Sequence, residues 1–284
     1  MTMTIREPKN VRPDILRWLP SKWDHIIGNR TLKTFFKKLL RRLRKVTEPG
    51  QLPDLNRLAM LLVGNSRSGK SSMIKFFLRC LICEEWDAET MNPCDGGCRT
   101  CRQKFDLFGL EGFDVEFYTP EGTRRVKLAI VDCPKISGPS ELRDKLNTTC
   151  YDTDPDEFRV MYFDEVHRLV DRQMDHMLLT AIEDRNFIWI FATAKPENLD
   201  EMFLNRLVKL KTEEPNEVEM IDWIIGRCND WKINYEPEAV LRTVEKSNRI
   251  PGTALHALAI ASLEPEEGLT LELVENEWDV KVSG

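Results

Sequence analysis

The chain has 284 residues, of which 42% are hydrophobic and 31% are charged, and its formal net charge is −6 at pH 7. This length and composition predict one large or two ordinary globular domains and exclude general disorder. The negative net charge argues against a uniformly basic nucleic-acid-binding protein, so any DNA contact would have to come from a local patch or from several subunits together. No apolar run approaches the roughly 18 residues of a membrane span, and residues 1–7 lack the apolar core of a signal peptide. Eight cysteines without a secretory signal favour a reducing, cytoplasmic compartment, where clustered thiols more often bind metal than pair.

The first predicted element is a helix over residues 30–46 with one apolar and one basic side. Leu32 and Leu43 fall on the apolar side, whereas Lys38 and Arg41 fall on the other. The basic side has two interpretations: a solvated helix face, or a local patch that contacts nucleic-acid phosphates.

A phosphate-binding loop follows a short apolar run at residues 59–63. The segment reads Gly64-Asn65-Ser66-Arg67-Ser68-Gly69-Lys70-Ser71-Ser72 and fills every fixed position of the pattern G-x-x-x-x-G-K-[ST]. Gly64 and Gly69 let the backbone curl so that successive N–H groups and the N-terminus of the next helix face phosphate oxygens. Lys70 can reach the β- and γ-phosphates, and the Ser71 hydroxyl can bind Mg²⁺. The motif therefore predicts a nucleotide site between a strand and a helix.

A cysteine-rich insert comes next, at about residues 80–104. Four thiolates in a tetrahedral array suit a closed structural zinc site, and the best quartet is Cys83, Cys94, Cys98 and Cys101. Cys80 lies about one helical turn before Cys83, so it is either a substitute ligand or an ordinary buried thiol. Free cysteines throughout are the alternative to a zinc site.

The next predicted elements are a strand at 126–132, a short helix at 139–149 and a second buried strand that starts at Phe158 and ends in Asp164 and Glu165. An apolar run that finishes in two acids is typical of a parallel sheet whose ligand lies at the carboxyl edge. Asp164 would hold Mg²⁺, mostly through water, and Glu165 would orient and polarise an attacking water.

The remaining elements complete two domains. A helix at 171–183 precedes a third core strand, Phe187–Ala194, and a helix end at Leu204 runs into a short strand. Helices are then predicted at 216–230, 236–247 and 252–263, with a last helical element near 269–278. Strands that alternate with helices, followed by helices alone, predict an α/β nucleotide-binding domain at 1–213 and a helical lid domain at 214–284.

These motifs together resemble an AAA+ ATPase, and more closely the motor region of the bacterial DNA polymerase III gamma/tau clamp-loader subunit. The likeness rests on the phosphate loop, the cysteine insert (whose spacings are slightly longer here), the segment Phe163–Leu169 and the order of the later motifs. It implies a P-loop NTPase fold with a parallel sheet flanked by helices, a zinc insert and a lid. It also implies ATP, Mg²⁺ and Zn²⁺ as cofactors, with Arg17, Ile27 and Gly28 on the adenine side.

The resemblance further implies oligomers that assemble through AAA+ interfaces, DNA as a partner, and contacts with replication or recombination proteins. In such an oligomer Arg206 would act in trans as an arginine finger on a neighbouring subunit's nucleotide. The alternative for Arg206 is a structural salt bridge. Thr193 is the candidate sensor-1 residue, although the register of the family places Ala194 in that slot.

Other positions depart from the family pattern. The sensor-2 arginine of the lid is replaced by Leu255, and Arg249 is the nearest cation that could compensate. The chain also leaves no room for the collar domain of clamp loaders, which predicts a shortened relative. We therefore expect an ATPase that is slow or stimulated by a partner and acts in DNA replication, repair or mobile-element transactions. The alternatives are a nucleotide-binding scaffold with little hydrolysis and, less favoured, an unrelated P-loop kinase.

Overall fold

The structure is a computed structural model that describes residues 15, 18–45, 58–104, 113–119, 122–150, 158–170, 174–183 and 187–276, with the backbone alone at some segment ends and across 102–127. The described residues form two compact units. One is Pro20–Glu213, and the other combines Glu214–Gly284 with the residues up to Leu19. The boundary predicted at 213/214 placed those first residues in the nucleotide domain, and in this respect the structure differs.

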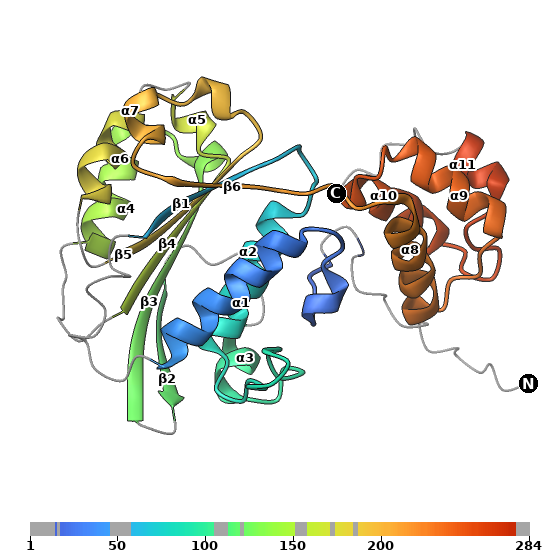
Figure 1. The fold of residues 1–284 in the computed structure, drawn as a ribbon, viewed down its shortest axis with the longest axis horizontal. Coiled ribbons are helices and arrows are strands. Elements are labelled where there is room, and N and C mark those ends of the chain that lie inside the picture. Colours follow the sequence, from blue (N-terminus) through green and yellow to red (C-terminus); the bar gives the residue numbers. More distant parts are fainter. Residues whose placement is uncertain are drawn as a thin grey trace, which may run out of the picture. The chain divides into compact units, whose positions relative to one another are not determined.

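The larger unit contains a sheet of six described strands in the order β2-β3-β4-β5-β1-β6 (Figure 1). Their bounds are β1 Ala59–Val63, β2 Phe113–Thr119, β3 Gly122–Asp132, β4 Phe158–Asp164, β5 Phe187–Thr193 and β6 Val208–Lys211. β2 pairs antiparallel with β3 at one edge, and the other neighbours are parallel. The predicted parallel sheet is confirmed. No strand was predicted at 113–119.

The helices of this unit form two layers on the sheet. They are α1 Arg30–Lys45, α2 Lys70–Ile82, α3 Arg99–Lys104, α4 Pro139–Cys150, α5 His167–Val170, α6 Asp175–Ile182 and α7 Glu201–Leu204. Met60 and Tyr162 belong to the core shared with α1 and α2, whereas Leu61 and Phe163 belong to the core shared with α4, α6 and α7. Because successive strand residues face opposite sides, both faces are buried, which explains the continuous apolar runs in the sequence.

The helix predicted at 171–183 corresponds to α6, Asp175–Ile182, and residues 171–173 lie outside the described residues. The shorter helix α5 precedes the predicted range. α5 ends at Val170, and α6 begins at Asp175. The buried Met174 lies between them, and its N–H donates to the Leu169 carbonyl oxygen over 2.9 Å.

The basic side of α1 is partly committed to contacts within the fold. The Lys33 ammonium donates to the Ile26 carbonyl oxygen over 2.9 Å, and Lys37 lies over the Trp23 ring, 5.7 Å from its centroid. Lys38 and Arg41 remain exposed. The two predicted interpretations, a solvated face and a phosphate-contacting patch, therefore concern only the exposed residues of this helix, and their exposure is compatible with both.

The smaller unit is helical, with α8 Glu217–Trp231, α9 Pro237–Lys246, α10 Pro251–Ala261 and α11 Leu271–Asn276. A capping box starts α8: the Glu219 N–H donates to the Asn216 side-chain oxygen over 2.9 Å, and the Asn216 N–H donates to the Glu219 carboxylate over 3.0 Å. Prolines at the start of α9 and α10 suit the first helical turn, where no N–H partner is needed.

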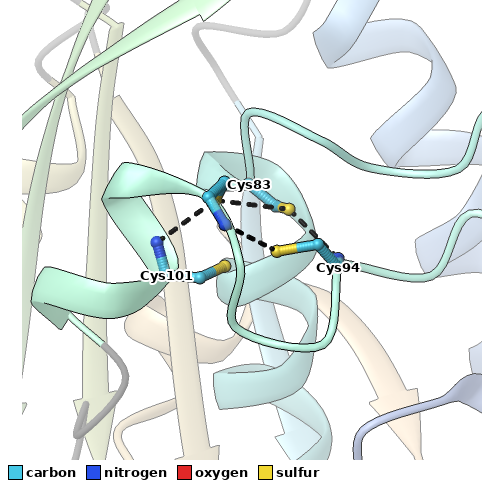
Figure 2. A group of neighbouring side chains, drawn as sticks. Cys83, Cys94 and Cys101 are labelled. Atoms are coloured by element: carbon cyan, nitrogen blue, oxygen red, sulfur yellow. Dashed lines mark hydrogen bonds between the residues drawn. The ribbon is translucent and has the colours of Figure 1, made fainter.

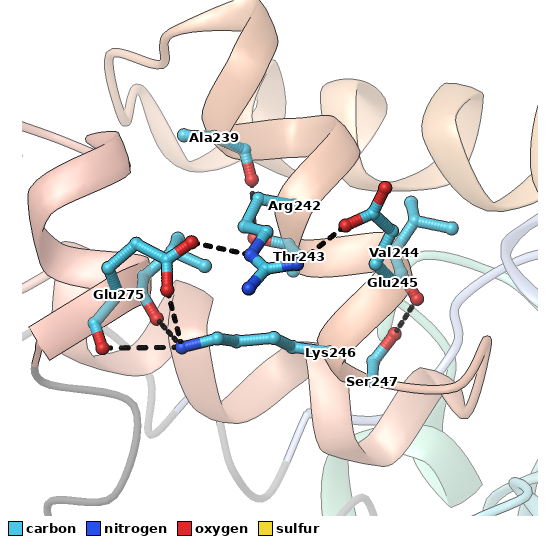
Figure 3. Close-up of polar contacts among 9 residues, drawn as sticks. Ala239, Arg242, Thr243, Val244, Glu245, Lys246, Ser247 and Glu275 are labelled. Atoms are coloured by element: carbon cyan, nitrogen blue, oxygen red, sulfur yellow. Dashed lines mark hydrogen bonds and ion pairs between the residues drawn. The ribbon is translucent and has the colours of Figure 1, made fainter.

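Two contact networks hold this unit together. Trp18 packs edge-on against Trp223 and Trp231, and the Arg227 guanidinium lies 5.0 Å from the Trp18 ring centroid. This packing explains why Trp18 groups with the C-terminal helices. In Figure 3, Arg242 and Lys246 of α9 both reach the Glu275 carboxylate of α11, which ties the last helix to the unit. No helix within the described ranges combines the length and apolarity that a membrane span needs.

Candidate functional site

The phosphate-binding loop lies where the carboxyl ends of three parallel strands meet. It follows β1, and the sheet register places Val63 beside Thr193, the last residue of β5. The Gly64 N–H donates to the Thr193 carbonyl oxygen over 3.3 Å, so the loop is attached to the neighbouring strand. Gly69 has a φ of 88°, in the left-handed region that glycine adopts without strain, and α2 begins at the next residue.

Lys70 is buried at the base of this loop. Its ammonium donates to the Gly64 and Asn65 carbonyl oxygens, each over 2.9 Å. Burial lowers the pKa of Lys70, while the nearby carboxylates of Glu165 and Asp164 act in the opposite direction. Among the described residues no carboxylate pairs directly with this ammonium. A buried lysine held only by carbonyl oxygens is suited to an anionic ligand, which is the role predicted for it.

The other loop residues are more exposed than Lys70. Asn65, Ser66 and Arg67 are exposed, whereas Ser68 and Gly69 are half-buried. The Ser68 hydroxyl is buried and has no hydrogen-bond partner within the described part of the chain. An unpaired buried hydroxyl is costly, so this atom fits a site that takes an additional polar group. Ser72 is half-buried in the first turn of α2.

The predicted magnesium ligands are brought together. The Ser71 hydroxyl donates to the Asp164 carboxylate over 3.0 Å, although 93 residues separate them in the sequence. A hydroxyl and a carboxylate are the hard oxygen ligands that Mg²⁺ binds, and a bound Mg²⁺ would neutralise phosphate charge there. The two residues therefore fit the predicted ion.

Glu165 directly follows β4 and has a φ of 54°, an unusual conformation for a residue with a side chain. The turn is attached to β5, because the Val166 N–H donates to the Ala192 carbonyl oxygen over 2.9 Å. A His167 ring nitrogen, Nδ1, lies 3.2 Å from the Glu165 carboxylate and 3.0 Å from the Thr193 hydroxyl. The sequence motifs predict no role for this histidine.

Tyr162 is a second residue without a predicted role. It lies two positions before Asp164 on the same face of β4, is fully buried, and its hydroxyl has no hydrogen-bond partner of good geometry within the described residues. Burial raises the pKa of Tyr162, and the Asp164 carboxylate adds to that shift. An aromatic residue in a buried strand carries no local sequence signal that separates it from ordinary core.

The four predicted zinc ligands converge. The sulfur atoms of Cys83, Cys94, Cys98 and Cys101 all lie within 4.8 Å of one another. Figure 2 shows labelled members at the end of α2, in the following loop and on α3. Four zinc-bound thiolates lie roughly 3.8 Å apart, given Zn–S bonds of about 2.3 Å. The Cys83 and Cys98 sulfur atoms are 4.0 Å apart, so the cluster fits a zinc ion with little movement.

Backbone donors surround the cluster. N–H groups of Cys94, Cys98 and Cys101 each point at a cysteine sulfur, over 3.2 to 3.5 Å. Hydrogen bonding from Cys101 is the largest cause that lowers the pKa of Cys83, to about 5. Donors aimed at sulfur favour thiolates, the form that binds zinc.

Cys80 is not part of this group. It lies within the apolar core, and burial raises the pKa of its thiol. Of the two alternatives left open for Cys80, the structure therefore supports the ordinary buried thiol.

Two arginines attach the cysteine-rich insert, called the cysteine module from here on, to α1 and α2. The Arg44 guanidinium donates to the carbonyl oxygens of Cys80, Leu81 and Cys83, which end α2, and lies 4.4 Å from the Trp86 ring centroid. Arg79 donates to the Cys94 carbonyl oxygen over 2.7 Å. Carbonyl groups at a helix C-terminus lack intrahelical donors, so Arg44 satisfies them and also complements the helix dipole.

Arg206 lies on the surface after α7. It donates to the Met202 carbonyl oxygen over 2.9 Å and pairs with the Glu183 carboxylate at 3.2 Å. Exposed pairs of this kind contribute about 0–1 kcal/mol, so the pair would hold the guanidinium only weakly. Both interpretations from the sequence, a finger and a salt-bridging arginine, remain compatible with this position.

The remaining predicted residues are placed as follows. Ile27 is buried, and Gly28 has a φ of 61°. The side-chain oxygen of the next residue, Asn29, accepts a hydrogen bond from the Glu213 N–H over 2.9 Å. Leu255 is half-buried on α10, and Arg249 faces Glu214 at 4.0 Å. Arg17 lies outside the described residues.

Comparisons with known proteins agree with this architecture. The Thermotoga maritima RuvB Holliday junction branch migration motor aligns with a TM-score of 0.57 and 16% identity, covering 92% of this chain and 71% of that one. PCH-2 from C. elegans aligns with a TM-score of 0.52 and 16% identity, covering 90% and 70%. The fold is that of an AAA+ P-loop ATPase. No family model matches the sequence, and neither does any curated protein.

Proposed function

We propose that this chain binds ATP with Mg²⁺ and hydrolyses it as an AAA+ protein of the clamp-loader type, acting in DNA replication, repair or mobile-element DNA transactions. The observation that carries the proposal is the joining of two sequence-distant segments at one sheet edge. Lys70 is buried in the loop, Ser71 contacts Asp164, and Glu165 follows directly.

Different residues of the site have different roles in the proposed reaction. In the proposed reaction a water oxygen bonds to the γ-phosphorus while the bond to the β–γ bridging oxygen breaks, which yields ADP and inorganic phosphate. Lys70 and the loop N–H groups offset phosphate charge, and the Glu165 carboxylate orients the water and accepts its proton. When bound to Ser71 and Asp164, Mg²⁺ would neutralise charge on the phosphate oxygens.

The proposed DNA role is supported by the fold, by sequence features and by surface charge. RuvB, whose fold this chain shares, is a Holliday junction branch migration motor. The cysteine module, the segment around Asp164 and the resemblance stated from the sequence favour the clamp-loader type. Exposed Lys38 and Arg41 on α1 offer local positive charge on an acidic protein.

Steady-state hydrolysis by purified protein, with and without primed DNA, tests the proposal. Lys70→Ala should abolish ATP binding and turnover. Glu165→Gln should keep ATP binding but lower turnover by about 10²- to 10⁴-fold, the usual contribution of a general base. Lys209→Ala and Glu197→Gln, which change exposed residues outside this site and outside the basic side of α1, are the matched controls. Turnover that survives Lys70→Ala would refute the proposal.

A second candidate is a nucleotide-binding scaffold that barely hydrolyses ATP. It is favoured by Leu255 at the position of the sensor-2 arginine and by Arg249, which faces Glu214. In the same experiment a scaffold would bind ATP in a Lys70-dependent manner and show no turnover with or without DNA. Glu165→Gln would then leave its biological activity unchanged.

A further inference from the structure

His167 is buried beside the proposed catalytic glutamate. It is 3% exposed and begins α5, two residues after Glu165. Its Nδ1 atom lies 3.2 Å from the Glu165 carboxylate oxygen Oε2 and 3.0 Å from the Thr193 hydroxyl oxygen. Among the described residues His167 is the side chain in polar contact with this carboxylate. A single ring atom thus touches both the glutamate and the end of the neighbouring strand.

The chemistry of the two groups determines which of them donates the hydrogen bond. An ionised carboxylate can only accept, so Nδ1 must carry a hydrogen to bond with Glu165. The Thr193 oxygen accepts the Lys195 N–H over 3.0 Å, which fixes it at the end of β5. The one Nδ1 hydrogen therefore lies between two acceptors, the Glu165 carboxylate and the Thr193 oxygen, and links the glutamate to the end of β5.

The backbone alone does not fix the orientation of the Glu165 side chain. The carboxylate is 31% exposed at the end of a strand, and the residue has a φ of 54°. The backbone turn itself is attached to β5 through Val166 and Ala192. The side chain of a partly exposed glutamate nevertheless has several rotamers, and holding one carboxylate oxygen selects among them.

We infer that His167 is a positioning residue that holds the Glu165 carboxylate toward the attacking water and couples its orientation to Thr193 at the end of β5. The inference rests on the proposed ATP hydrolysis and adds to it a residue with a defined role. It also gives Thr193 a function that does not require direct contact with the nucleotide.

Two amide substitutions test this inference, because each places a donor at a different ring position. Asparagine presents its amide near the site of Nδ1, whereas glutamine presents it near the site of Nε2. His167→Asn should keep kcat within a few-fold of wild type. His167→Gln should lower kcat by up to about 100-fold, the scale on which misplacement of a reacting group acts. The KM for ATP and the affinity for a fluorescent ATP analogue should stay unchanged in both.

Several outcomes would overturn the inference. Equal kcat in His167→Gln and wild type shows that the contact is not needed, and a raised kcat shows that His167 restrains Glu165 instead. Loss of ATP affinity together with a lowered Tm in both variants indicates a purely structural histidine. Wild-type protein without Lys70-dependent turnover refutes the proposed function, and this inference falls with it.

A measurement on the unmodified protein keeps the test independent of variant folding. Long-range ¹H–¹⁵N spectra distinguish which imidazole nitrogen carries hydrogen. A hydrogen on Nδ1 of His167, with a shift that changes in Glu165→Gln, supports the inference. A bare Nδ1 in the wild type contradicts the donor geometry on which it depends.

Discussion

Gly64 and Gly69 are both fixed glycines of the phosphate loop, but the structure requires them for different reasons. Gly69 has space around it and needs glycine because of its positive φ. At Gly64 the constraint is space: a Cβ atom would lie 1.8 Å from the Thr212 hydroxyl oxygen. Thr212 is placed there because its N–H donates to the Val63 carbonyl oxygen over 2.8 Å, just past β6. The sequence motif alone does not distinguish these two requirements.

Gly64→Ala should therefore destabilise the protein by about 1–3 kcal/mol, the usual cost of overpacking, and weaken ATP binding. Thr212→Ala removes the nearest clashing atom and should recover part of that loss in the double variant. Urea unfolding of the wild type, the two single variants and the double variant measures the coupling between the two positions. If Gly64→Ala costs the same stability with and without Thr212→Ala, the predicted clash is not the cause.

At the scale of elements, the cysteine module depends on α2 and α1. Cys83 ends α2, and Arg44 of α1 binds the carbonyl groups at that helix end. The module itself contains one short helix, α3, so few backbone hydrogen bonds stabilise it internally. A metal bound by four thiolates would supply the missing stability, because its binding free energy adds directly to folding.

We expect about one zinc ion per purified chain, measured by inductively coupled plasma mass spectrometry. Cys98→Ser should lose the zinc and make residues 83–104 a preferred site of limited proteolysis. Cys80→Ser is the matched control and should retain the metal, because Cys80 lies in the apolar core. Metal-free wild-type protein that resists protease equally well would argue against a zinc site.

At the scale of the whole molecule, the proposed finger residue requires more than one chain. Arg206 lies on the surface, and its partner Glu183 is exposed. A guanidinium in such a place can act on another subunit's γ-phosphate if the chains assemble through AAA+ interfaces. This step belongs to the proposed function, since it depends on assembly.

Mixing two inactive variants tests action in trans. Arg206→Ala keeps Glu165 but offers no finger, whereas Glu165→Gln offers the finger but lacks the glutamate. Each alone should retain less than about 1% of wild-type turnover, and the mixture should recover activity. A Glu165→Gln/Arg206→Ala double variant is the control, because it has no finger to donate. A mixture no more active than the sum of its parts would refute action in trans.

Much of the site could be read from the sequence because its signals are local. The phosphate loop has fixed positions within nine residues, and Asp164 and Glu165 end an apolar run. The α/β class follows from strands alternating with helices, and the zinc quartet from thiols that are close in the chain. These patterns depend on backbone geometry and ligand chemistry that act over a few residues.

Only the tertiary structure decided which distant groups meet. Thr193 is 26 residues from His167, and their contact depends on the pairing of β4 with β5. Arg44 reaches the end of α2 because α1 packs beside it, and Cys80 faces core rather than sulfur because of its place on that helix. Strand register and helix packing arise from burial of the whole apolar surface, so no short segment encodes them.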